Sequence, residues 1–217
     1  MTQTLHTALR VTIFAAAFAF VESSVVVYLR ALYYPEGFSF PLKPLAPDMV
    51  AMEIVRECST IIMLAAVGAL AGRSRWEKFS WFLIAFGVWD ILYYVWLKVT
   101  IGWPATMIDW DVLFLVPLPW IGPVIAPVLI ALLMVILGIL AVFRLANGRF
   151  FHPGWLSWIL ALAATIILLY SFMLDIPATL GGQPPSPYPY QFLAIGLLLY
   201  GWAFVLSCRE RADSRRP

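Results

Sequence analysis

Six long apolar stretches constrain this chain more than any other feature of its sequence. A membrane-spanning helix needs about 20 mostly apolar residues, because the hydrocarbon core is about 30 Å thick and a helix rises about 1.5 Å per residue. Stretches that meet this requirement cover residues 9–33, 49–71, 79–99, 122–145, 155–175 and 190–208. We therefore expect residues 1–217 to form a single integral membrane domain, an all-α polytopic bundle of six transmembrane helices.

The composition excludes a water-soluble domain and several kinds of active site. Apolar residues make up 63% of the chain and charged residues 12%, whereas soluble domains have about 45–50% and about 25%. Two cysteines, Cys58 and Cys208, are too few for a disulfide scaffold. No His or Cys cluster has metal-ligand spacing, and no hydrolase or nucleotide-binding motif is present. We therefore predict no metal, no cofactor and no nucleic-acid partner.

The distribution of basic residues predicts the orientation. With a cytoplasmic N-terminus, ten of the fourteen Lys and Arg residues lie in cytoplasmic segments, including the basic tail over 209–217. Basic residues accumulate on that side of a membrane, so we expect a multi-pass protein of the plasma (inner) membrane with both termini cytoplasmic. A signal peptide cleaved near Ala19 is the alternative for the N-terminus. The apolar run continues past that site, which favours an uncleaved first helix.

The connection between the third and fourth spans, residues 100–122, is too apolar for a solvated loop and too rich in proline for a helix. Irregular backbone at membrane depth is tolerated only where protein or a water-filled cavity covers it. We interpret this connection as a re-entrant or interfacial segment at the outer end of the bundle. The alternative is an ordinary interfacial loop anchored by its aromatic residues, Trp103, Trp110 and Trp120.

Ionisable residues deep in the first three spans are the strongest candidates for a site: Glu22, Glu53, Arg56, Glu57 and Asp90. Each costs about 2.5–3.5 kcal/mol at a helix centre. Glu22 and Asp90 lie about one residue from the midpoints of their spans, and Glu57 lies about three residues, roughly 5 Å, from its own. Three carboxyl groups from three helices are therefore expected at nearly one level of the bilayer.

The spacing of these residues predicts their contacts. Glu53 and Glu57 are four positions apart and face the same way, and Arg56 can form an ion pair with Glu53 three positions earlier. These spans contain four acids and one base, Arg56. Even if Arg30 and Lys98, which lie nearer the outer ends, turn inward, the four acids have at most three bases. One carboxyl is then left without a base, and such a group either stays protonated or holds a cation. This arrangement is typical of a proton relay or a cation site.

A purely structural interpretation of the same residues stays open. In that case Arg56 bridges Glu22 and Glu53 as a network that joins the helices. Asp90 would then bond to a nearby hydroxyl group, that of Tyr93, Ser23 or Ser24. Structural networks of this kind also perturb ionisable groups without any functional role.

Four residues near the outer ends are candidate accessory residues: Arg30, Lys98, Asp109 and Asp111. The two aspartates have the D-x-D spacing by which some sugar transferases hold a divalent cation, although ordinary capping is the simpler interpretation. Lys98 is typical of a side chain that reaches towards the membrane surface. Gly68 and Gly72 form a G-x-x-x-G pattern suited to close contact between helices.

Three functions remain open from the sequence. The first is translocation of a proton, a cation or a small solute through the cluster of carboxylates and arginine in spans 1–3. The second is a non-catalytic membrane subunit or assembly factor, whose partner would be another membrane protein or a second copy of this chain. The third is a lipid-modifying enzyme active at the outer leaflet, with carboxyl groups as general acid and base. In every case the lipid bilayer is the surrounding partner.

Overall fold

The computed structural model describes residues 2–40, 42–43, 46–115 and 119–209, and six of its helices are long and apolar enough to cross a membrane. The elements are α1 (Thr2–Tyr33), α2 (Pro47–Ala71), α3 (Arg75–Ile101), β1 (Trp110–Phe114), β2 (Trp120–Pro123), α4 (Ile125–Ala146), α5 (Trp155–Met173), α6 (Ile176–Leu180) and α7 (Tyr190–Ser207). The prediction of a helical bundle with six spans is confirmed. The largest difference in bounds is at α1, which continues through the polar N-terminal turns that an apolar stretch leaves out.

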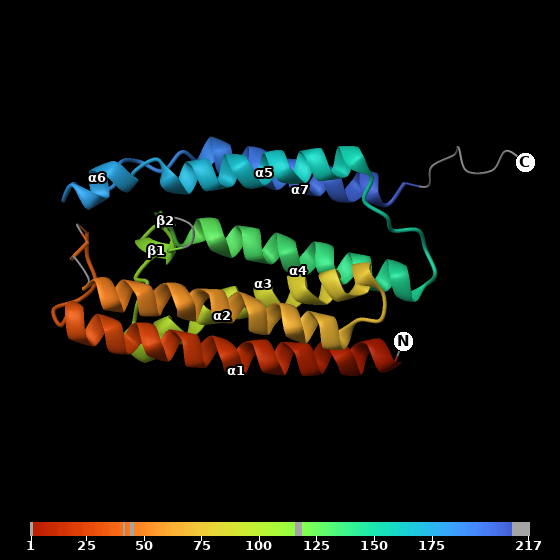
Figure 1. Ribbon diagram of the computed structural model, residues 1–217, viewed down its shortest axis with the longest axis horizontal. Coiled ribbons are helices and arrows are strands. Elements are labelled where there is room, and N and C mark those ends of the chain that lie inside the picture. Colours follow the sequence, from red (N-terminus) through yellow and green to blue (C-terminus); the bar gives the residue numbers. More distant parts are fainter. Residues whose placement is uncertain (1, 41, 44–45, 116–118, 210–217) are drawn as a thin grey trace, which may run out of the picture.

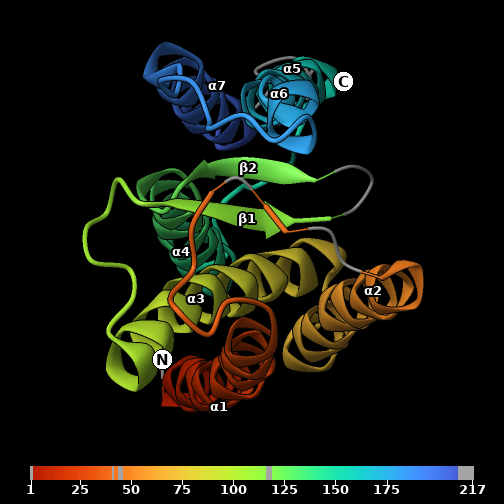
Figure 2. The same cartoon turned by 90° about the vertical axis from the view of Figure 1, so that its left-hand side faces the viewer.

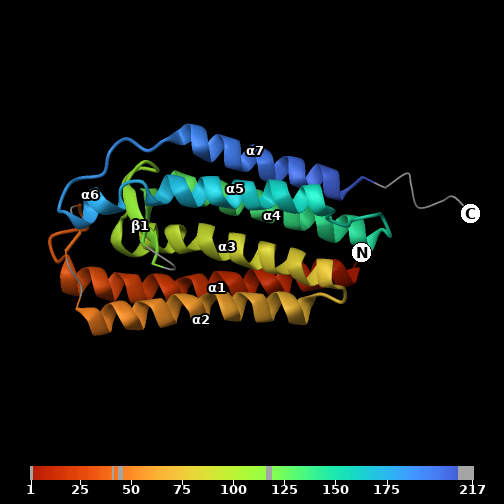
Figure 3. The ribbon, with the colours of Figure 1, turned by 45° about the horizontal axis from the view of Figure 1, so that its top comes forward.

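The long helices run side by side, and both ends of the described chain lie at the same end of the bundle (Figure 1). We call this the terminal end, and we call the opposite end, with β1, β2 and α6, the hairpin end. Helix α3 packs against α1, α2 and α4 and is therefore central to one half of the molecule. Helices α5 and α7 pack against each other as a separate pair, which lies above the other helices in the view of Figure 1 (Figures 1 and 3).

The packing of α3 against its neighbours depends on small residues. Ala15 and Ala19 of α1 are fully buried in the core that includes Trp81 of α3. A Cβ atom at Gly68 of α2 would lie 2.8 Å from the carbonyl oxygen of Lys78, so the close approach expected at this glycine is present. Small side chains let helix backbones come together where lipid provides no hydrophobic driving force.

The connection between α3 and α4 contains the one element type that the sequence did not predict. Strand β1 pairs with β2 in an antiparallel hairpin, in which Trp110 lies opposite Pro123. The hairpin lies between the α5–α7 pair and the α1–α3 half of the bundle (Figure 2). The ring of Trp120 stacks on that of Phe172 from α5, with centroids 6.1 Å apart. The hairpin thus covers the interior of the bundle at this end.

Candidate functional site

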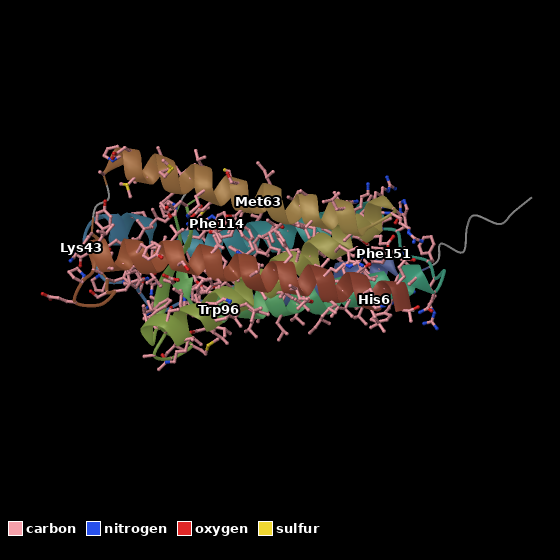
Figure 4. All side chains as sticks on the ribbon, turned by 90° about the horizontal axis from the view of Figure 1, so that it is seen from below. His6, Lys43, Met63, Trp96, Phe114 and Phe151 are labelled. Carbon is pink, nitrogen blue, oxygen red and sulfur yellow. The ribbon has the colours of Figure 1, made fainter. Side chains whose placement is uncertain are left out.

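A cavity of about 720 Å³ lies at the hairpin end, between α1, α2, α3, β1 and the region of α6. Its lining includes every candidate residue of the first three spans, together with two accessory residues and one further lysine: Glu22, Glu53, Arg56, Glu57, Asp90, Arg30, Asp111 and Lys43. In Figure 4, Lys43 lies at the extreme hairpin end and Phe114, another lining residue, lies deeper in the bundle. We call this space the acid cavity.

An arginine-centred network joins α1 to α2 at the base of the acid cavity. The Arg56 guanidinium donates to Glu53 Oε2, with Nη2 at 2.7 Å, and also donates to Glu22. The Thr60 hydroxyl donates to the other oxygen of Glu22 at 2.8 Å. Glu22 and Glu53 are only 4% and 7% exposed. Charge-assisted bonds of this kind offset the cost of burying carboxylates. The bridge expected in the structural interpretation is therefore present.

Glu57 connects α2 to the hairpin. The backbone N–H of Leu115, just after β1, donates to Glu57 Oε2 at 2.8 Å. The carboxyl group is buried and is one helical turn from Glu53 on the same face of α2. This contact gives the backbone N–H of Leu115 an acceptor and links the end of β1 to α2 at the cavity.

Asp90 of α3 is half-buried in the wall of the acid cavity. The hydroxyls of Ser23 and Ser24 donate instead to the carbonyl oxygen of Phe20, at 3.0 and 2.7 Å. No described residue forms a hydrogen bond or an ion pair with the Asp90 carboxyl group. The expectation that a hydroxyl of Ser23, Ser24 or Tyr93 would bond to Asp90 is therefore wrong, because these serines are satisfied within their own helix.

A second ion pair lies nearer the mouth of the cavity and was not predicted. Arg30 Nη2 of α1 donates to Asp111 Oδ1 of β1 at 2.8 Å. The guanidinium lies over the rings of Phe38 and Trp103, at 4.3 and 3.7 Å from the ring centroids. Arg30 therefore does turn inward, but its partner is the hairpin rather than an acid of the spans.

The Arg30–Asp111 pair is incompletely satisfied. Arg30 Nη1 and Asp111 Oδ2 are buried and have no hydrogen-bond partner among the described residues, and the same is true of the hydroxyl oxygen of Thr179 in α6. All three residues line the acid cavity. Burial raises the pKa of Asp111 to about 6, because it disfavours the ionised form more than the Arg30 charge favours it.

The remaining accessory residues stabilise the loop after α3. Lys98 donates to the carbonyl oxygens of Gly102 and Pro104, at 3.1 and 2.7 Å. Asp109 accepts the backbone N–H of Ala105 at 2.7 Å and the hydroxyl of Thr106 at 2.6 Å. Burial alone would raise the pKa of Asp109, but these hydrogen bonds outweigh it and hold the pKa below its ordinary value. Asp109 therefore stabilises the turn that precedes it, whereas the sequence predicted that these aspartates cap residues 112–116.

The D-x-D pattern does not form one site, because its two carboxylates are engaged by different partners: Asp109 by its own loop and Asp111 by Arg30. Within the described part of the chain, no three His, Cys, Asp or Glu side chains are grouped so that they could hold a metal ion. The structure therefore offers nothing that would make the aspartates a metal centre.

Towards the terminal end, the acid cavity gives way to apolar packing. The next layer includes Ala19, Leu64 and Ala85, all fully buried, together with Trp81 and Ile84. The described polar lining thus ends near the middle of the bundle, and the cavity opens at the hairpin end, where Lys43, Gly181 and Gly182 are exposed.

Sequence reasoning missed the aromatic wall of the cavity and the contribution of α6. Trp89, Tyr93 and Tyr94 lie beside Asp90 on α3, and Phe114 comes from β1. Tyr93 and Tyr94 are three and four residues after Asp90, and this spacing was a signal that their rings share its side of the helix. Thr179 has no comparable signal in the sequence.

The chain matches no protein-family model, and no curated protein or solved structure is significantly similar to it. A function can therefore be inferred only from the chemistry of the site.

Proposed function

We propose that this protein moves a proton, a cation or a small polar solute across a membrane, with the acid cavity as its binding site. The observation that carries the proposal is the grouping of five carboxyl groups, from α1, α2, α3 and β1, around one cavity that opens at one end. Ionisable residues inside a membrane are costly and rare, and those that face a cavity mark ion and solute pathways.

The proposed orientation places the hairpin end outside the cell. Both termini are then cytoplasmic, and the basic residues near the terminal end face the cytoplasm: Arg10, Arg73, Arg75, Arg144 and Arg149. This distribution satisfies the positive-inside rule for a plasma (inner) membrane protein. The segment over residues 100–122, which includes β1 and most of β2, is then the re-entrant or interfacial segment that shapes the outer entrance to the cavity.

Apolar packing closes the cavity towards the terminal end, and this favours a carrier over a channel. A carrier must hold a state in which the binding site opens to one side while packed side chains block the other. The apolar layer around Ala19 and Leu64 supplies that block. In the proposed mechanism Asp90 takes up the ion, while the Arg56 network keeps α1 and α2 in register.

Flux measurements on reconstituted protein test the proposal. The wild-type protein would be placed in vesicles that contain a pH-sensitive dye, and proton, Na⁺ or K⁺ gradients would be imposed in turn. We expect flux above that of protein-free vesicles, and a loss of at least about tenfold in Asp90→Asn, because the variant removes the charge without changing the shape of the side chain. Asp48→Asn is the matched control, since Asp48 is exposed and lies outside the cavity lining.

The outcomes of this experiment are distinct. Flux that Asp90→Asn abolishes and Asp48→Asn leaves unchanged supports the proposal. Flux that is the same in wild type, Asp90→Asn and protein-free vesicles overturns it. Size-exclusion profiles and circular dichroism of each variant confirm that the protein under test is folded.

A second candidate function is that of a non-catalytic membrane subunit. The observation that favours it is the complete pairing of Arg56 with Glu22 and Glu53, which joins two helices. This function predicts co-purification with a larger membrane complex, and it predicts that Asp90→Asn does not alter flux. The flux experiment therefore separates the two candidates.

A further inference from the structure

Among the described residues, the acid cavity is lined by more carboxyl groups than basic groups. Five carboxyl groups line it, against two arginines and a lysine at the mouth. Arg56 serves Glu22 and Glu53, and Arg30 serves Asp111. Asp90 has neither an ion pair nor a hydrogen bond among the described residues. A half-buried carboxylate that has no partner among the described residues is not compensated by the protein, so a positively charged ligand at this point is favoured.

A second observation is a buried acceptor atom in the cavity wall, beside Asp90 and next to Arg30 Nη1, a buried donor that also has no partner among the described residues. Asp111 is only 3% exposed, and its carboxyl group interacts with Tyr94 and the backbone of Val112 as well as with Arg30, but its Oδ2 atom has no partner at hydrogen-bond geometry among the described residues. Buried polar atoms in folded proteins nearly always have a partner. An unpartnered acceptor in the cavity wall fits a ligand that carries a hydrogen-bond donor or a positive charge.

The walls around Asp90 are aromatic. Trp89 and Tyr93 lie with ring centroids 6.2 Å apart, and Tyr93 and Tyr94 with centroids 5.0 Å apart. The faces of aromatic rings attract cations, most strongly where water is excluded. The chain already holds one cation in this way at the same cavity, because the Arg30 guanidinium lies over two rings.

The size and chemistry of the cavity favour an organic ligand over a bare metal ion. A volume of about 720 Å³ is that of a site for a small organic molecule. In the described residues no group of His, Cys, Asp and Glu side chains could coordinate a metal. Apolar and aromatic walls require a ligand with an apolar body, and the unbalanced acid requires that it carry a positive charge.

We propose that the solute is an organic monocation, a protonated amine or a quaternary ammonium with an apolar or aromatic body. Its charge lies between Asp90 and Asp111, and its body lies against the rings of Trp89 and Tyr93. This inference names the substrate class of the carrier proposed above and rests on that function, but ligand binding can be measured without any flux.

Binding of tetraphenylphosphonium to the protein in lipid nanodiscs tests the ligand class. Binding to empty nanodiscs is subtracted, and two competitors of similar size are compared, benzyltrimethylammonium and benzylsulfonate. We expect the ammonium to displace the probe and the sulfonate to leave it bound. This comparison uses the wild-type protein alone, so it does not depend on the folding of any variant.

Variants then locate the site. We expect Asp90→Asn to weaken probe binding by at least about tenfold and Asp48→Asn to leave it unchanged. Tyr93→Phe keeps the ring and should bind like wild type, whereas Tyr93→Leu should bind about threefold to tenfold more weakly. Equal displacement by both competitors, or equal affinity of Asp90→Asn and wild type, overturns the inference.

The binding experiment and the flux experiment test the two proposals separately. Cation binding without any flux, including flux of the bound organic cation itself, leaves the ligand class standing and removes the transport proposal. Proton flux without cation binding leaves transport standing and removes the organic monocation.

Discussion

Replacing Arg56 by glutamine tests how much the network at the base of the acid cavity contributes to stability. The substitution removes the only base within hydrogen-bonding distance of Glu22 and Glu53 in the described structure. Both acids are almost fully buried, so neither can turn to water without a change in helix packing. The variant therefore leaves two buried carboxyl groups with reduced compensation.

The magnitude follows from burial. Removing one partner of a fully buried ion pair costs about 3–5 kcal/mol, because the remaining charge stays desolvated. The Arg56 side chain is 22% exposed, so part of its charge is already screened by the surroundings. The hydrogen bond from Thr60 to Glu22 also remains in the variant. We therefore expect a loss at the lower end, about 3 kcal/mol of unfolding free energy.

The assay is reversible unfolding of the protein in mixed micelles, followed by circular dichroism. Arg56→Gln is compared with the triple variant Glu22→Gln, Glu53→Gln, Arg56→Gln, which removes all three charges at similar shape. We expect the triple variant to recover most of the stability, because neutral amides in place of the ions remove the uncompensated charge. A triple variant whose loss equals or exceeds the sum of the single losses would refute this reasoning.

Three further predictions test other contacts. The carboxyl group of Asp111 should titrate near pH 6 rather than near 3.8 in infrared spectra, and Arg30→Gln should move its pKa further up, because the cation that lowers it is gone. Glu57→Leu should speed exchange of the backbone amide hydrogen that Glu57 accepts by about tenfold, whereas Glu57→Gln, which keeps an acceptor, should change it little. Gly87→Ala should destabilise the protein by about 1–3 kcal/mol, because its Cβ would lie 2.5 Å from a backbone oxygen of α4, while Gly201→Ala, with open space around it, should not.

The bundle could be predicted from the sequence because its signals are long and local. A stretch of about 20 apolar residues has one stable solution in a membrane, since the helix satisfies every backbone group within the segment. The spacing of Glu53 and Arg56 likewise determines their contact, because three residues along a helix bring side chains together.

The hairpin and the second ion pair could not be predicted in the same way. Arg30 and Asp111 are 81 positions apart in sequence, and their contact depends on how the connection after α3 folds back over the bundle. That connection carries apolar and proline residues but no regular alternation, so its two strands have no clear signal. Nothing in the sequence therefore indicates that the partner of Arg30 lies on β1.

The buried charges do not all have the same role: some of them join helices, and another is available for binding. Arg56, Glu22 and Glu53 satisfy one another across α1 and α2, as a network that only joins helices would require. Asp90 lies on the neighbouring helix α3, in the wall of the same cavity, and takes no part in that pairing. If Arg56 were free to turn towards Asp90, it would cancel the charge that a cationic ligand needs. By holding Arg56, the two glutamates keep Asp90 available, so the structural network is itself a condition of the proposed binding site.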